Sequence, residues 1–84
     1  MNSKHAKLLR MCHLHYMARV INETPAGMAP HVPELKKAAD QLQAMVLELW
    51  PKLTHKQRGK VWHSMFVGVG LNNIARMVVT MAQG

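Results

Sequence analysis

The side chains with the clearest chemical potential lie in one short stretch, Cys12-His13-Leu14-His15. Thiolate and imidazole groups are good ligands for zinc. In a helix, Cys12 and His15 share a face, and His5 lies seven residues before Cys12, so these three side chains can converge on one ion. The sequence shows no evident fourth ligand and contains no C-x-x-C or H-x-x-x-H pair. We therefore predict no metal site and no cofactor.

Catalytic residues are not indicated either. The chain has four carboxylates, Glu23, Glu34, Asp40 and Glu48, and none of them belongs to a cluster that contains His or Ser. Acid–base and nucleophilic catalysis both require such groups within hydrogen-bonding reach of one another. A chain of 84 residues also leaves little room for a large active site. We therefore expect a protein that is not an enzyme.

Positive charge gathers at the two ends of the chain. The formal charge is +4 over residues 1–22, −2 over residues 23–50 and +5 over residues 51–84. The first and third of these segments contain no acidic residue. Such a surplus favours a polyanion or an acidic protein surface as partner, and the alternative is a charged face that serves only solubility.

The third segment supplies the candidate macromolecule-binding residues. Its cations provide electrostatic attraction, and apolar side chains of the same predicted helix are candidate anchors if their stripe is exposed. The set comprises Lys52, Lys56, Arg58, Lys60, Arg76, Trp62, Met65 and Phe66. The predicted partner is an acidic protein surface or a nucleic acid, and no membrane.

The elements that must position these residues all have helical periodicity, with apolar side chains recurring every three or four residues. The predicted helices span about 3–21, 34–50, 55–67 and 71–82, and a linker spans 22–33. We expect a single all-α domain, a small bundle of three long helices. The third helix should be bent or split near Gly68 and Gly70, because each glycine weakens a helix by about 1 kcal/mol relative to alanine.

Local signals place the ends of these helices. Asn2 or Ser3 can cap the first helix, and Thr54 with Gln57 forms the capping-box pattern S/T-x-x-E/Q at the start of the third. The residues that break the chain in the linker are Pro25, Gly27, Pro30 and Pro33. The side chains expected to point inward from the third helix and the turn after it are Val61, Trp62, Met65, Phe66 and Val69. Those expected outward are Lys56, Arg58 and Lys60.

Residues 53–76, LTHKQRGKVWHSMFVGVGLNNIAR, contain the pattern LT..QR..V......G.....IAR. This pattern resembles the first half of the helix-turn-helix of resolvase and transposase DNA-binding domains, whose first helix opens L-T-x-x-Q-R. In that family the helix that enters the major groove follows the I-A-R helix after a turn. Only MVVTMAQG follows Arg76, so a recognition helix is absent and base readout of that kind is not expected.

These observations favour a small basic binding protein, of the kind that phages and mobile elements encode, which docks on a host or regulatory macromolecule. The alternative is a dimeric DNA- or RNA-binding transcriptional regulator. A homodimer is the simplest way to cover an apolar stripe left exposed, because a small helical chain gains core by pairing. A lone Cys12 and the lack of a visible signal peptide or membrane span predict a cytoplasmic location.

Overall fold

The computed structural model describes residues 1–25, 27–28 and 31–84. Within them the elements are α1 (Ser3–Glu23), α2 (Val32–Leu49), the 3-10 helix η1 (Trp50–Lys52), α3 (His55–Phe66) and α4 (Leu71–Gln83). These residues contain no strand, so the predicted all-α class is confirmed. The predicted count of three long helices differs from the structure, because the third predicted helix, expected to be bent or split near Gly68 and Gly70, is split into α3 and α4.

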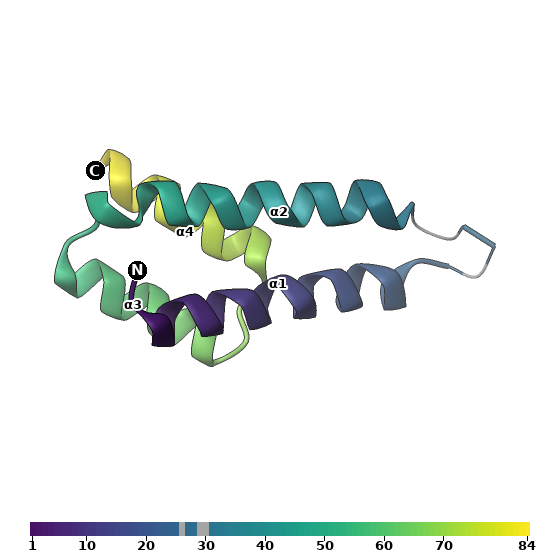
Figure 1. Cartoon of the computed structure of the whole chain (residues 1–84), viewed down its shortest axis with the longest axis horizontal. Coiled ribbons are helices and arrows are strands. Elements are labelled where there is room, and N and C mark those ends of the chain that lie inside the picture. Colours follow the sequence, from purple (N-terminus) through teal and green to yellow (C-terminus); the bar gives the residue numbers. More distant parts are fainter. Residues whose placement is uncertain (26, 29–30) are drawn as a thin grey trace.

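Helices α1 and α2 form an antiparallel hairpin along the 45 Å axis of the molecule (Figure 1). Helix α1 begins after Asn2, whose Oδ1 accepts a hydrogen bond from the backbone N–H of His5 at 2.9 Å. Helix α2 carries Pro33 in its first turn, where the missing N–H removes no helical hydrogen bond. The part of the predicted linker at Ala26, Ala29 and Pro30 lies outside the described residues.

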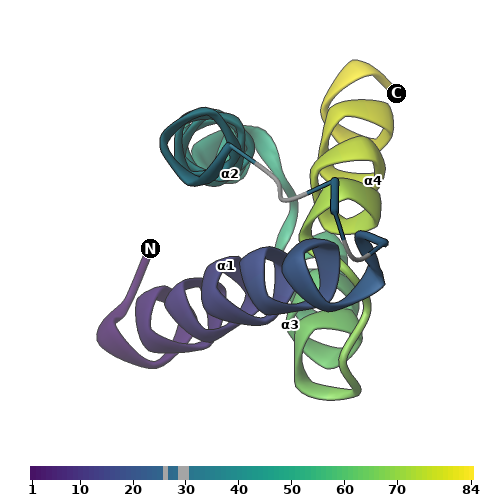
Figure 2. The ribbon, with the colours of Figure 1, turned by 90° about the vertical axis from the view of Figure 1, so that its right-hand side faces the viewer.

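Helices α3 and α4 cover one end of this hairpin, with α4 packed mainly on α2, and α3 beside α1 (Figures 1 and 2). The capping box at the start of α3 is confirmed. The N–H of Gln57 donates to Thr54 Oγ1 at 3.2 Å, and the N–H of Thr54 donates to Gln57 Oε1 at 2.9 Å. This reciprocal pair satisfies two amides at the start of the helix.

The break between α3 and α4 depends on the backbone of Gly68. Its φ of 91° is in the left-handed region, which side chains rarely adopt. The N–H of Gly68 donates to the carbonyl of Met65, and the N–H of Val69 donates to that of Ser64, which closes the last turn of α3. Gly70 then precedes α4 as its N-cap, without a side-chain hydrogen bond.

The core lies where the four helices meet. Its largest fully buried side chains are Leu9 of α1, Val46 of α2, Val61 of α3, and Leu71, Ile74 and Val78 of α4. Burying each such aliphatic side chain contributes about 1.5–3 kcal/mol. Among the described residues, no helix is long and apolar enough to cross a bilayer.

Candidate functional site

Helix α3 carries two neighbouring rows of apolar side chains, and only one of them enters the core. Val61 is fully buried and Met65 is 3% exposed, whereas Phe66 in the next row is 66% exposed. Successive residues of a helix are about 100° apart, so Trp62 and Phe66 lie beside the buried row and point toward the edge of the core. The prediction of an inward Phe66 is therefore wrong, and Trp62 is half-buried.

The exposed row of α3 faces the first turns of α1. We call the combined surface the α1–α3 face. It consists of Lys4, His5, Lys7, Leu8 and Met11 from α1, and His55, Arg58, Trp62 and Phe66 from α3. Two hollows lie on this face, and both include Trp62 in their lining.

The first hollow, the Phe66 groove, has a volume of about 330 Å³. Its floor is apolar, and two lysines of α1 contribute to its lining. The lining residues are Lys4, Lys7, Leu8, Met11, Trp62 and Phe66. The rings of Trp62 and Phe66 are stacked, with centroids 5.4 Å apart and planes 12° apart. The groove therefore presents an aromatic stack, exposed at Phe66 and half-buried at Trp62, together with two cations.

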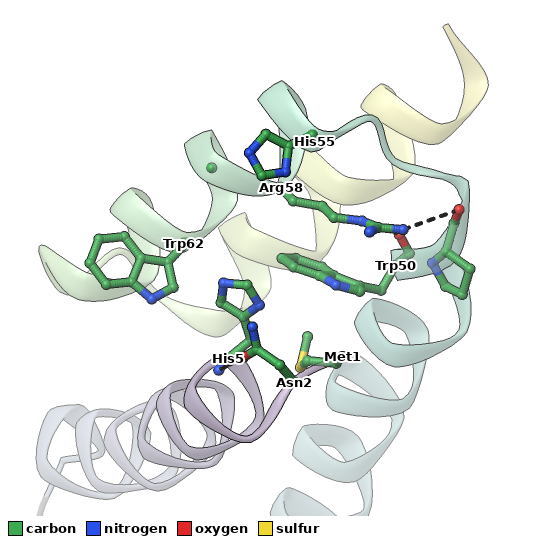
Figure 3. Close-up of a pocket in the computed structure, with 9 residues that line it drawn as sticks. Met1, Asn2, His5, Trp50, His55, Arg58 and Trp62 are labelled. Atoms are coloured by element: carbon green, nitrogen blue, oxygen red, sulfur yellow. Dashed lines mark hydrogen bonds between the residues drawn. The ribbon is translucent and has the colours of Figure 1, made fainter.

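The second hollow, the Trp50 pocket, has a volume of about 600 Å³ and lies between the start of α1, η1 and the first turns of α3 (Figure 3). Its lining residues are Met1, Asn2, His5, Trp50, Pro51, His55, Arg58, Gly59 and Trp62. Figure 3 shows the Trp50 ring between His5 and Arg58, with Trp62 on the far side of the pocket. The pocket thus combines two indole rings with two imidazoles and a guanidinium group.

Arg58 is held in place by the turn that precedes its helix. Its Nε donates to the carbonyl of Trp50 at 3.2 Å, and Nη2 donates to that of Pro51 at 3.4 Å. Its Cζ lies 5.9 Å from the centroid of the Trp50 ring, within the range of a cation–π contact. The remaining N–H groups of Arg58 are not used in these bonds, and the side chain lines the pocket.

His5 lies on the other side of the Trp50 ring from Arg58 (Figure 3). Its ring centroid is 5.1 Å from that of Trp50, at an interplanar angle of 57°. Burial, followed by the positive charges of the N-terminal ammonium and Arg58, lowers the pKa of His5 below 6.5. His5 is therefore mainly neutral at neutral pH, where it offers one donor and one acceptor.

None of the residues that define the α1–α3 face is acidic. The four carboxylates of the chain lie at the end of α1 and along α2, at Glu23, Glu34, Asp40 and Glu48. Two lysines and an arginine with no carboxylate between them create a positive potential over both hollows. The face therefore suits an anionic ligand.

The structure does not bring the predicted binding residues together in one place. Arg58, Trp62 and Phe66 lie on the α1–α3 face. Lys56 and Lys60 lie on the other side of α3, beside Met77 and Met81 of α4. Lys52 in η1 and Arg76 in α4 are exposed outside both hollows. Met65 belongs to the core and cannot serve as an exposed anchor, because its side chain is only 3% exposed.

The predicted set missed the contribution of α1. Lys4, Lys7, Leu8 and Met11 follow the three- and four-residue spacing of one helix face, so their grouping on α1 is readable from the sequence. Their pairing with α3 depends on tertiary packing, and no local pattern predicts it.

The Cys12-His13-Leu14-His15 stretch scatters its side chains. Cys12 is buried, which raises the pKa of its thiol, and its Sγ lies 3.9 Å from the carbonyl of Met65. His13 pairs with Asp40 across the hairpin, and His15 is exposed. No three His, Cys, Asp or Glu side chains in the described ranges are grouped to hold a metal ion.

Comparison with known proteins found no matching family model, no matching curated protein and no matching solved structure. The resemblance of residues 53–76 to half of a helix-turn-helix therefore stays a prediction.

Proposed function

We propose that the chain is a small, basic, non-enzymatic binding protein that docks on an acidic macromolecule through the α1–α3 face. The observation that carries this proposal is the stack of half-buried Trp62 on exposed Phe66, which lines one groove with Lys4 and Lys7 of another helix and with no carboxylate. Aromatic side chains are the usual anchors of binding surfaces. Surrounding cations increase the rate of encounter with an anionic partner.

The chemical groups of the two hollows support a binding role. The Trp50 pocket and the Phe66 groove supply ring faces, N–H donors and ammonium groups. Such groups recognise an anion. General acid–base catalysis by a carboxylate would require an aspartate or glutamate, and the lining of neither hollow includes one.

Charge reversal at matched positions tests the proposal. Lys7→Glu changes a lysine of the α1–α3 face, and Lys37→Glu makes the same change at an exposed position of α2. Binding to poly-L-glutamate and to an oligonucleotide is measured at one low salt concentration. We expect Lys7→Glu to weaken binding of at least one polyanion about tenfold, which is about 1.4 kcal/mol. Lys37→Glu should have a much smaller effect.

Two outcomes would reject the proposal. One is that neither polyanion binds to the unaltered protein at low salt. The other is that Lys7→Glu and Lys37→Glu weaken binding equally, since attraction would then depend on net charge and not on this face. Circular dichroism of each variant confirms that the helices are retained.

The dimeric regulator stays the second candidate. Apolar side chains are exposed on the hairpin, at Leu14 (58%), Ile21 (40%), Met28 (70%) and Val32 (49%). A second copy of the chain is one way to cover them. Light scattering after size-exclusion chromatography measures the mass, and Leu14→Glu should convert a dimer to a monomer. A monomeric mass for the unaltered protein would reject this candidate.

A further inference from the structure

We infer that the α1–α3 face binds single-stranded nucleic acid, with a base stacked on the Trp62–Phe66 pair and phosphates near Lys4, Lys7 and Arg58. This inference rests on the proposed function and names its partner. Proteins that bind single strands without sequence preference combine aromatic stacking platforms with a positively charged path for the backbone. The face contains both parts.

The aromatic pair has the geometry of a stacking platform. The two rings are within 12° of parallel, and Phe66 is 66% exposed. Every base has a π-face, so stacking on such rings is tolerant of sequence. A ring pair inside the core would leave no room for a base, but this pair lies at the edge of the core and lines an open groove.

Cations line both of the hollows that share Trp62. Lys4 and Lys7 line the Phe66 groove from α1, and Arg58, about one helical turn before Trp62 in α3, lines the Trp50 pocket. A strand that stacks one base on the platform can therefore place a phosphate near the cations of either hollow. The sequence pI of about 10.2 is also in the range typical of nucleic-acid-binding domains.

The Trp50 pocket has room for a neighbouring nucleotide. Its volume of about 600 Å³ is within the range of about 300–1,000 Å³ common for small-ligand sites. Arg58 brings unused N–H groups, and the imidazoles of His5 and His55 add polar contacts. These are suitable partners for phosphate oxygens and for the carbonyl groups of bases.

A single strand fits this face better than a duplex or an acidic peptide. In a duplex the bases are paired and stacked on each other, which leaves the exposed rings without a role. An acidic peptide would pair with the lysines. Its apolar side chains, however, would pack as well on a leucine at position 66 as on two parallel rings. The ring geometry therefore decides between the three partners, and it can be varied separately from hydrophobicity.

Phe66 provides the test. Fluorescence anisotropy measures binding of a labelled oligo-dT of about twelve nucleotides, a length within the usual site size. The same assay is run with oligo-U, a duplex of equal length and poly-L-glutamate. Phe66→Leu keeps an apolar side chain without a ring, and Phe66→Tyr keeps the ring. Leu47→Ala, on an exposed position of α2, is the control for loss of apolar surface.

We expect oligo-dT to bind the unaltered protein more tightly than the duplex. Phe66→Leu should weaken this binding about tenfold, and Phe66→Tyr and Leu47→Ala should change it less than twofold. Phe66 is largely exposed, so each variant should keep its helical circular dichroism. Binding of oligo-U shows whether the site also accepts RNA. Binding of a single strand of either DNA or RNA supports the inference.

Other results overturn the inference in distinguishable ways. If poly-L-glutamate binds and Lys7→Glu weakens it while oligo-dT does not bind, the partner is an acidic protein and only this inference fails. If duplex and single strand bind equally and Phe66→Leu has no effect, binding depends on charge alone and the stacking site is wrong. If no polyanion binds, the proposed function fails as well.

Discussion

Nε2 of His13 lies 2.8 Å from Oδ1 of Asp40, and this pair joins α1 to α2 in the middle of the hairpin. His13 is 8% exposed, so its polar ring would be costly to bury without a partner. The second carboxylate oxygen of Asp40 accepts from Lys36 Nζ at 3.0 Å. The hydrogen bonds from Lys36 and His13 lower the pKa of Asp40 below its usual 3.8.

The Asp40 contact predicts a loss of stability in acid. The folded-state pKa of Asp40 is below the unfolded value of 3.8. Ionised Asp40 therefore makes its full contribution to the free energy of unfolding at pH values above 3.8. The contribution is lost as the pH falls through the folded-state pKa. We expect Asp40→Asn to unfold at lower urea concentration than the unaltered protein at neutral pH, and the difference to shrink in acid.

The control for Asp40→Asn is Glu48→Gln, an exposed carboxylate about two turns further along α2. It removes the same charge without removing the contact with His13. Equal effects of the two substitutions at every pH would contradict a specific role for the pair.

Gly68 and Gly59 should respond to the same substitution with opposite signs. A Cβ would meet no atom within 4 Å at either position, so only the backbone differs. Gly68 has φ 91°, which alanine adopts at a cost of about 1–2 kcal/mol, whereas Gly59 lies within α3. Gly68→Ala should lower the free energy of unfolding, and Gly59→Ala should raise it by about 0.5–1 kcal/mol. Chemical denaturation measures both, and a gain for Gly68→Ala would contradict the left-handed turn.

The ends of α3 were predictable from the sequence because they depend on local signals. Thr54 and Gln57 lie three residues apart and bond to each other, and Gly68 permits a backbone that few other residues adopt. These signals predicted a helix over 55–67, and the structure has His55–Phe66. Whether Gly68 would bend one long helix or separate two depended on how α4 packs on α2.

The binding surface was less predictable. Val61 and Met65 form one apolar row and Trp62 and Phe66 form the next, and the sequence does not say which row meets the core. That choice depends on the positions of α1, α2 and α4. The same packing brings Lys4 and Trp62 into the lining of one groove, although the two are far apart in the chain.

Adjacent residues Met65 and Phe66 should therefore separate stability from binding. Met65 is 3% exposed and packs in the core, so Met65→Ala should cost about 2–5 kcal/mol of unfolding free energy. Phe66 is 66% exposed, so Phe66→Ala should change stability by less than about 1 kcal/mol. Urea denaturation of both variants checks the assignment. A large loss for Phe66→Ala would mean that its ring supports the core and not a binding surface.

His5 reports on the Trp50 pocket through its titration. Burial is the main cause of its lowered pKa, and the N-terminal ammonium and Arg58 add to it. Between the folded-state pKa and 6.5 the unfolded chain binds more protons, so this histidine makes the protein less stable as the pH falls through that range. NMR titration of the His5 ring protons should give a midpoint below 6.5. Arg58→Gln should raise this midpoint only part of the way toward 6.5, because the burial of His5 remains. An anion in the pocket should raise the midpoint further, since it favours the charged imidazole. The titration is repeated with oligo-dT at a concentration where it binds. If the midpoint of His5 does not change, the bound strand lies away from His5.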